Sequence, residues 1–143
     1  MTKVVIVGGG HAGANTAFAL RKDGFDGNIN IVSDESYLPY HRPPLSKDFL
    51  KQKIEEDKLS FKTAEFYNDQ NISLNLNTRV QSIDLESNKV FSDDGSFDFD
   101  YLVFATGAAP RLLPMKNADA ENLFYLRQIS DVVSMKKVIA AGK

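Results

Sequence analysis

The sequence contains no cysteine and no tryptophan, and only two of its 143 residues are histidine. Without cysteine, the chain has no disulfide framework, no zinc site with thiolate ligands and no catalytic thiol pair. His11 and His41 are too few and too far apart for a typical histidine-rich metal site. We therefore predict no metal ligands.

Long apolar runs and a strong net charge are also missing. No run approaches the roughly 18 residues that span a bilayer, and glycines interrupt the apolar start that a signal peptide would need. The net charge of −2 gives no indication of a nucleic acid or an anionic membrane as partner. A hydrophobic content of 43% in 143 residues suffices for one domain with a real core. We expect a cytoplasmic protein.

The most informative stretch begins with residues 4–7, four β-branched apolar residues typical of a buried parallel strand. Glycines follow in the spacing G-x-G-x-x-G. The first permits a tight turn, the second lets a pyrophosphate approach the backbone, and the third lets the following helix pack closely. The N–H groups of the first helical turn would face the phosphates. The candidate phosphate-binding residues are Gly8, Gly10, His11, Ala12 and Gly13.

The residues after this motif complete a β-α-β pattern. An apolar helical face precedes Gly24, which can end the helix, and residues 29–32 form the next apolar strand. Asp34 lies 21 residues beyond Gly13, where a ribose-binding acid belongs, and Glu35 is an equal candidate. Two adjacent acids would repel an adenosine 2′-phosphate, which favours NAD or FAD over NADP. The alternative is a β-α-β unit whose glycine turn is only structural.

The remaining elements are predicted from local patterns. Three prolines exclude a strand or helix before position 45, and Ser46 can cap a short helix carrying Lys47. Further helices begin after Thr63 and at Ser130 and Asp131, the latter with residues 132, 133, 135, 138 and 139 on its apolar side. Strands are predicted at residues 72–76, 78–85, 89–92, 97–99, 101–104 and 123–127.

Two further stretches are candidates for ligand contact. The proline-rich loop presents Arg42 and Lys47, which composition alone also allows as solvated cations on a rigid linker. Ala105, Thr106 and Gly107 follow a buried strand, and such small residues let a ligand approach the carboxyl edge of a sheet.

The segment P-Y-H-R-P-P-L-S-K-D-F, at residues 39–49, resembles the signature of flavoprotein NADH:ferredoxin reductases that serve bacterial oxygenases. In that family this loop replaces the redox-active cysteine pair of glutathione-reductase-like relatives, which agrees with the cysteine-free sequence. The resemblance implies FAD as cofactor, with Arg42 balancing phosphate or flavin charge and Lys47 near the reactive edge of the isoalloxazine. It further implies that the Val80 backbone contacts adenine and that Arg127 lies near the flavin. The A-T-G segment at residues 105–107 corresponds to the second FAD motif of the family.

The resemblance implies an α/β fold, a Rossmann-type FAD/NAD(P)-binding sheet with an inserted antiparallel β-meander. NADH would give a hydride to FAD, and single electrons would pass to a [2Fe-2S] ferredoxin or a rubredoxin. Residues 1–143 correspond to the N-terminal portion of the FAD-binding domain, an incomplete domain that lacks the NAD-binding and C-terminal domains. We expect this fragment to be inactive alone and to associate through its unfinished sheet.

Four alternatives stay open. The chain could be a complete small protein, or an isolated nucleotide-binding module without turnover. It could also be a fragment of an apoptosis-inducing-factor-like flavoprotein. Another flavin enzyme is the fourth: the absence of cysteine disfavours a thiol-dependent disulfide reductase, and R-P-P-L-S-K disfavours a monooxygenase.

Overall fold

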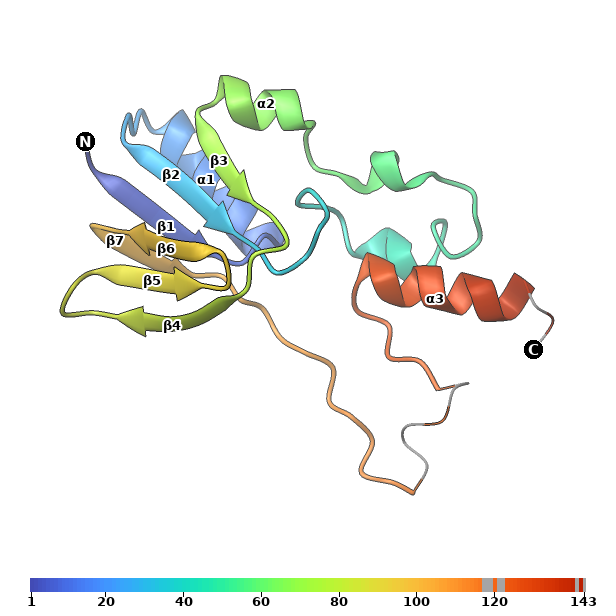
Figure 1. Ribbon diagram of the computed structural model, residues 1–143. Coiled ribbons are helices and arrows are strands. Elements are labelled where there is room, and N and C mark those ends of the chain that lie inside the picture. The colour runs from blue at the N-terminus through green and yellow to red at the C-terminus, as the bar shows by residue number, and fades with distance from the viewer. Residues whose placement is uncertain (117–119, 121–122, 141, 143) are drawn as a thin grey trace. The chain divides into compact units, whose positions relative to one another are not determined.

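The structure is a computed structural model that describes residues 1–116, 120, 123–140 and 142. The chain forms two compact units. The first combines Met1–Tyr40 with Ser60–Gly107, and the second combines His41–Leu59 with Ala108–Lys143. Figure 1 labels the helices and strands of both.

A four-stranded parallel sheet forms the centre of the first unit, in the order β3-β2-β1-β7. Its strands are β1 (Lys3–Val7), β2 (Asn28–Val32), β3 (Ile72–Asn75) and β7 (Tyr101–Phe104). All four strands were predicted from the sequence, and the predicted α/β class is confirmed. The chain adds strands on one side of β1 and then returns to its other side, so the strand order reverses at β1.

Both helices of the first unit begin where the sequence predicts, and the first also ends there. Helix α1 (His11–Lys22) is followed by Gly24, whose φ of +83° is a conformation that glycine adopts readily. Helix α2 (Ala64–Asp69) is capped by Thr63, whose hydroxyl accepts a hydrogen bond from the Phe66 N–H. Within the described residues, neither these helices nor any other is both long and apolar enough to cross a membrane.

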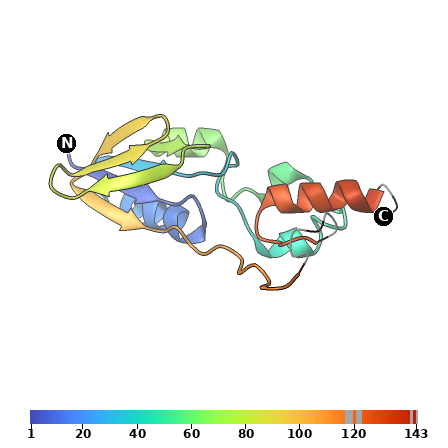
Figure 2. The ribbon, with the colours of Figure 1, turned by 60° about the horizontal axis from the view of Figure 1, so that its bottom comes forward.

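The predicted meander is a separate antiparallel sheet of β4 (Val80–Asp84), β5 (Lys89–Ser92) and β6 (Gly95–Asp98). Figure 2 shows it on one side of the parallel sheet and α1 on the other. Asp98 accepts hydrogen bonds from Lys89 on β5 and from Lys3 on β1. These two ammonium groups hold the pKa of Asp98 below its usual value and join the meander to the sheet.

Both faces of the parallel sheet are covered, which explains the uninterrupted apolar run in β1. Val4 and Ile6 pack with the apolar side of α1, whereas Val5 and Val7 pack with Val90 and other residues of the meander side. The side chains of residues 4–7 in β1 are all buried, and only Lys3 at the start of the strand is not. Residues 4–7 therefore have no face for polar side chains, as expected for a central parallel strand.

Strand β7 lies at an edge of the sheet, and among the described residues no strand pairs with its outer side. Tyr101 and Phe104 on this strand are 64% and 67% exposed. An exposed apolar edge is a template for pairing with another strand. Association of the chain through this edge stays a prediction.

The second unit contains η1 (Pro43–Ser46), η2 (Glu56–Leu59) and α3 (Ile129–Ala140). The prediction that prolines exclude a helix before position 45 is wrong, because Pro43 and Pro44 open a 3-10 turn. The fixed φ of proline suits the first helical positions, where its missing N–H is not needed. The helix predicted from Ser46 is also wrong, because Ser46 ends η1 and Lys47 has a non-helical backbone (φ −123°, ψ −109°).

The strand predicted at residues 123–127 is absent, since these residues form no element in the structure. Their backbone has other partners. The N–H groups of Arg127 and Gln128, which precede α3, donate to the carboxylate of Asp131 in the first turn of that helix, as the acid of a capping box does. Helix α3 begins at Ile129, close to the predicted start, but Ile139 is 59% exposed rather than on a buried side.

Tyr67 on α2 provides a test of the core. Tyr67 is only 1% exposed, and its hydroxyl has no hydrogen-bond partner in the described part of the chain. Burial raises the pKa of Tyr67 to about 12. The folded state thus favours the neutral phenol, and this contribution to stability is lost as pH rises from about 10 towards about 12. We expect Tyr67→Phe to remove most of that alkaline loss and to change stability by at most about 1 kcal/mol at neutral pH.

The measurement is urea unfolding at neutral pH and near pH 11, with the exposed Tyr101→Phe as control. An alkaline loss of stability that is equal in wild type and Tyr67→Phe would contradict the assignment.

Candidate functional site

Three chain segments meet at the carboxyl edge of the parallel sheet. They are the glycine loop after β1, residues 33–35 after β2, and residues 105–107 after β7. Since ligands of open α/β sheets bind outside the carboxyl ends of the strands, where the strand order reverses, this edge is the candidate site. Two of the predicted motifs, the glycine loop and A-T-G, lie together here.

Gly8 is the closest point between these two motifs. Its φ is +117°, and a Cβ on it would lie 2.2 Å from the Ala105 carbonyl oxygen and 3.0 Å from the Thr106 nitrogen. The Gly8 N–H donates to the Val32 carbonyl at 2.8 Å, and the Ala105 N–H donates to the Val7 carbonyl at 2.8 Å. The first glycine is therefore required by the segment that follows β7 as well as by its own turn.

The other glycines of the loop serve different contacts. A Cβ on Gly13 would lie 2.0 Å from the Gly8 carbonyl oxygen and 3.3 Å from Ile6, so α1 can pass close to the loop only with glycine here. A Cβ on Gly9 would lie 2.8 Å from the Ser33 hydroxyl oxygen. Sequence reasoning assigned no role to Gly9, although three consecutive glycines were a signal that could have found it.

Gly10 is the N-cap of α1, with φ −81° and ψ −166° and no side chain to cap the helix. The first turn of α1 carries no acidic residue. His11 and Ala12 are exposed there, and the His11 ring lies edge-on to Phe61 with centroids 4.6 Å apart. This helix end can present N–H groups and its partial positive charge to an anion.

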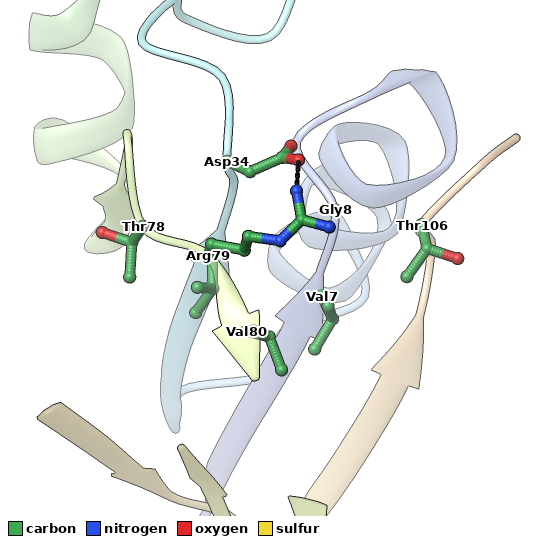
Figure 3. A pocket seen from close by; sticks show the side chains of 8 residues that line it. Val7, Gly8, Asp34, Thr78, Arg79, Val80 and Thr106 are labelled. Carbon is green, nitrogen blue, oxygen red and sulfur yellow. Dashed lines mark ion pairs between the residues drawn. The ribbon is translucent and has the colours of Figure 1, made fainter. Parts of the chain in front are cut away.

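The two acids that the sequence could not rank have different surroundings. Asp34 forms an ion pair with Arg79 (Figure 3), and the carboxylate oxygen lies 3.6 Å from the guanidinium nitrogen. The Glu35 carboxylate accepts a hydrogen bond from the Tyr40 hydroxyl at 2.6 Å. Of the two, Asp34 lines the pocket described next.

The pocket at this edge has a volume of about 230 Å³ (Figure 3). Whole small-molecule sites usually enclose roughly 300–1,000 Å³, so this pocket suits one part of a larger ligand. Val80, predicted from the resemblance, lines it, whereas Thr78 and Arg79 were not predicted. The lining residues are Val7, Gly8, Val32, Asp34, Thr78, Arg79, Val80 and Thr106.

Three predicted residues lie in the second unit. An Arg42 guanidinium nitrogen donates to the Arg127 carbonyl oxygen at 2.8 Å, so the structure brings these two residues together through a backbone contact. Lys47 is exposed at the end of η1, where its N–H donates to the Pro44 carbonyl oxygen at 2.9 Å.

Comparison with known proteins shows the family of the chain. The model of the family described as pyridine nucleotide-disulphide oxidoreductase matches residues 2–140. The chain belongs to this family. It is 42% identical to the ferredoxin–NAD(+) reductase component of a p-cumate 2,3-dioxygenase system from Pseudomonas putida, over 100% of this chain and 36% of the relative. It is 41% identical to a rubredoxin–NAD(+) reductase of the same species, over 94% and 35%.

Two solved structures of reductases are also similar to the chain. A putidaredoxin reductase in covalent complex with putidaredoxin matches with a TM-score of 0.89 and 40% identity, over 96% of this chain and 34% of that one. A ferredoxin reductase from Rhodopseudomonas palustris matches with a TM-score of 0.92 and 37% identity, over 99% and 35%. The chain spans about a third of the length of these proteins. The reductases of this family contain FAD and use NADH.

The contact between Gly8 and Ala105 yields a prediction about stability. Gly24 also has a positive φ, of +83°, but a Cβ there would meet nothing within 4 Å. Gly24→Ala should therefore cost about 1 kcal/mol of backbone strain alone. We expect Gly8→Ala to cost roughly 2 kcal/mol more, because its Cβ also collides with backbone.

Denaturant unfolding of both variants measures this difference. Equal losses of unfolding free energy would show that the close approach of Ala105 does not constrain Gly8.

Proposed function

We propose that the chain binds FAD at the carboxyl edge of its parallel sheet, as the FAD-binding portion of an NADH-dependent reductase. The observation that carries the proposal is the junction of Gly8 with Ala105, which places the glycine loop and the A-T-G segment beside one pocket. Family membership supports the choice of FAD.

The residues of the first unit suit the dinucleotide's AMP half and its pyrophosphate. In our proposal the pyrophosphate lies against residues 8–13 and the N-terminus of α1, where the three consecutive glycines at residues 8–10 leave the backbone free of side chains. Asp34 or Glu35 accepts hydrogen bonds from the ribose, and the Val80 backbone contacts the adenine. Ala105, Thr106 and Gly107 provide the small residues against which the cofactor is placed.

The residues of the second unit are assigned by resemblance to the flavin half. Arg42 would balance phosphate or flavin charge, Lys47 would lie near the reactive edge of the isoalloxazine, and Arg127 would lie near the flavin. When bound, the flavin supplies the change from two-electron to one-electron chemistry. The protein binds the two halves of the cofactor and provides the charged groups around them.

We further propose that residues 1–143 are the N-terminal portion of an FAD-binding domain whose parent protein passes electrons from NADH to a [2Fe-2S] ferredoxin or a rubredoxin. Two observations support this. The chain spans about 35% of a rubredoxin–NAD(+) reductase, and its structure matches a putidaredoxin reductase over 34% of that chain. On this proposal the 143-residue chain holds FAD but does not oxidise NADH.

Purification with FAD tests the proposal, and Gly10→Val is the diagnostic variant. The φ of −81° at Gly10 is open to any residue, so valine introduces bulk at the proposed phosphate site without forcing the backbone. We expect the wild type to be yellow and to release FAD on denaturation. Affinity for FAD and ADP should fall at least about tenfold in Gly10→Val, a loss of about 1.4 kcal/mol.

Circular dichroism checks that the variant is folded. Equal affinities of wild type and variant would show that the phosphate site is misassigned. NADH-dependent reduction of ferricyanide by the 143-residue chain would contradict the proposed division of functions.

Lys47 gives a prediction for the flavin potential of the FAD-bound protein. An ammonium near the flavin favours the reduced, negatively charged form, with a Coulomb attraction that solvent reduces to about 1–3 kcal/mol. For a two-electron couple this corresponds to roughly 20–60 mV. Lys47→Met should lower the midpoint potential by that amount, whereas Lys47→Arg should lower it less.

Redox titration measures the shift, with the exposed Lys51→Met as a control for the loss of one nearby surface charge. If the midpoint potential of Lys47→Met equals that of Lys51→Met, Lys47 does not belong to the proposed site.

A further inference from the structure

The pocket wall opposite Asp34 is formed by a residue to which neither the sequence nor the family resemblance gave a role. Arg79 precedes β4, and its guanidinium extends across the pocket to Asp34 at 3.6 Å (Figure 3). Both side chains are also accessible to solvent, at 69% for Arg79 and 55% for Asp34. An exposed ion pair of this kind contributes less than about 1 kcal/mol to folding, so fold stability does not account for it.

The backbone fixes the two residues opposite one another. The Thr78 N–H donates to the Ser33 carbonyl at 2.8 Å, and the Asn77 N–H donates to the Glu35 carbonyl at 3.0 Å. Asp34 lies between the two acceptors. Asn77 has a φ of +53°, a conformation that asparagine tolerates better than most residues. The loop before β4 is thus attached to the end of β2 on both sides of Asp34.

Hydrogen bonding also fixes Arg79 from its other side. Its carbonyl oxygen accepts from the Asp93 N–H at 3.2 Å, in the turn between β5 and β6. The Asp93 carboxylate in turn accepts from the Gln81 side chain, on the far side of Val80. The backbone that carries Arg79 is therefore held by β2 and by the meander, while its guanidinium remains at the pocket rim.

We propose that Arg79 is a positioning residue for the adenosine half of the dinucleotide. Its guanidinium holds the Asp34 carboxylate where that group can accept hydrogen bonds from the ribose hydroxyls. The flat face of the guanidinium covers the adenine beside Val80. A planar cation suits this place because it can stack on an aromatic base and donate to a carboxylate at the same time. The inference rests on the proposed function, since it assumes that the dinucleotide binds at this edge.

The pocket's size supports the choice of adenosine. Its volume of about 230 Å³ is too small for a whole dinucleotide. Residues at the ends of β1 and β2, at the start of β4 and after β7 line the pocket. The helix N-terminus and the glycine loop lie at the same edge for the phosphates. The pocket proposed for adenosine is therefore adjacent to the proposed phosphate site.

Binding of ADP, FAD and FMN to the 143-residue chain tests the inference, because FMN has no adenosine. Arg79→Met should weaken ADP and FAD by about 3- to 30-fold, the range expected for the loss of a stacked cation. It should leave FMN unchanged. Arg79→Lys keeps the positive charge but lacks the planar guanidinium, so it should restore less than half of the binding free energy that Arg79→Met loses. Lys58→Met, which removes an exposed cation 3.4 Å from Asp57, is the matched control.

A double-mutant cycle separates positioning from a bare charge effect. If Arg79 acts through Asp34, Asp34→Asn and Arg79→Met should together weaken ADP less than the product of their separate effects. Independent effects would overturn the positioning role, and so would unchanged or tighter ADP binding by Arg79→Met. If the wild type binds neither ADP nor FAD, the proposed function itself fails. If it binds both and Arg79→Met behaves like Lys58→Met, only this inference fails.

Discussion

One close approach governs the arrangement of the first unit. Gly8 lies so near the Ala105 carbonyl oxygen that no side chain fits between them. Strands β1 and β7 run parallel in register, with Val7 beside Phe104, and both end at this point. The absence of a Cβ lets the two strand ends leave the sheet together. The glycine loop and the A-T-G segment consequently form one edge of the molecule instead of two separate turns.

The coverage of the sheet explains why the site lies at the strand ends. Helix α1 and its neighbours bury one face of the parallel sheet, and the meander buries the other. Neither face leaves room for a ligand beside β1, whose residues 4–7 are all buried. Beyond the last ladder hydrogen bonds, backbone N–H groups and short polar side chains become available. Packing thus restricts ligand chemistry in this unit to the carboxyl edge.

Charge at this edge is arranged by contacts between distant parts of the chain. Arg79 lies beside Asp34, while Tyr40 donates to Glu35, so two adjacent acids have different partners. The description of the pyridine nucleotide-disulphide oxidoreductase family refers to disulphides. This chain contains no cysteine, so it cannot itself supply a redox-active disulphide. The chemistry we propose therefore relies on a bound cofactor and on the charged side chains around it.

The sequence alone determined the parallel strands, the glycine loop with its helix, and the meander. These follow from local patterns: an uninterrupted apolar run for a strand covered on both faces, fixed glycine spacing for a turn, and alternation with a turn for a hairpin. Such patterns carry their information within a few residues. The 3-10 turn at Pro43 was missed because proline suits a helix start as well as a loop.

Only the tertiary structure decided the rest. It distinguished Asp34 from Glu35, placed Arg79 at the pocket, and gave Gly9 a contact with Ser33. It also shows an irregular segment before α3 where a strand was predicted. The Arg127 N–H donates to Asp131 and the Arg127 carbonyl accepts from Arg42, so neither group bonds to a neighbouring strand. Most of these outcomes depend on residues tens of positions apart in the chain. Their partners are set by which strands become neighbours and where each strand ends, and no local pattern contains that information.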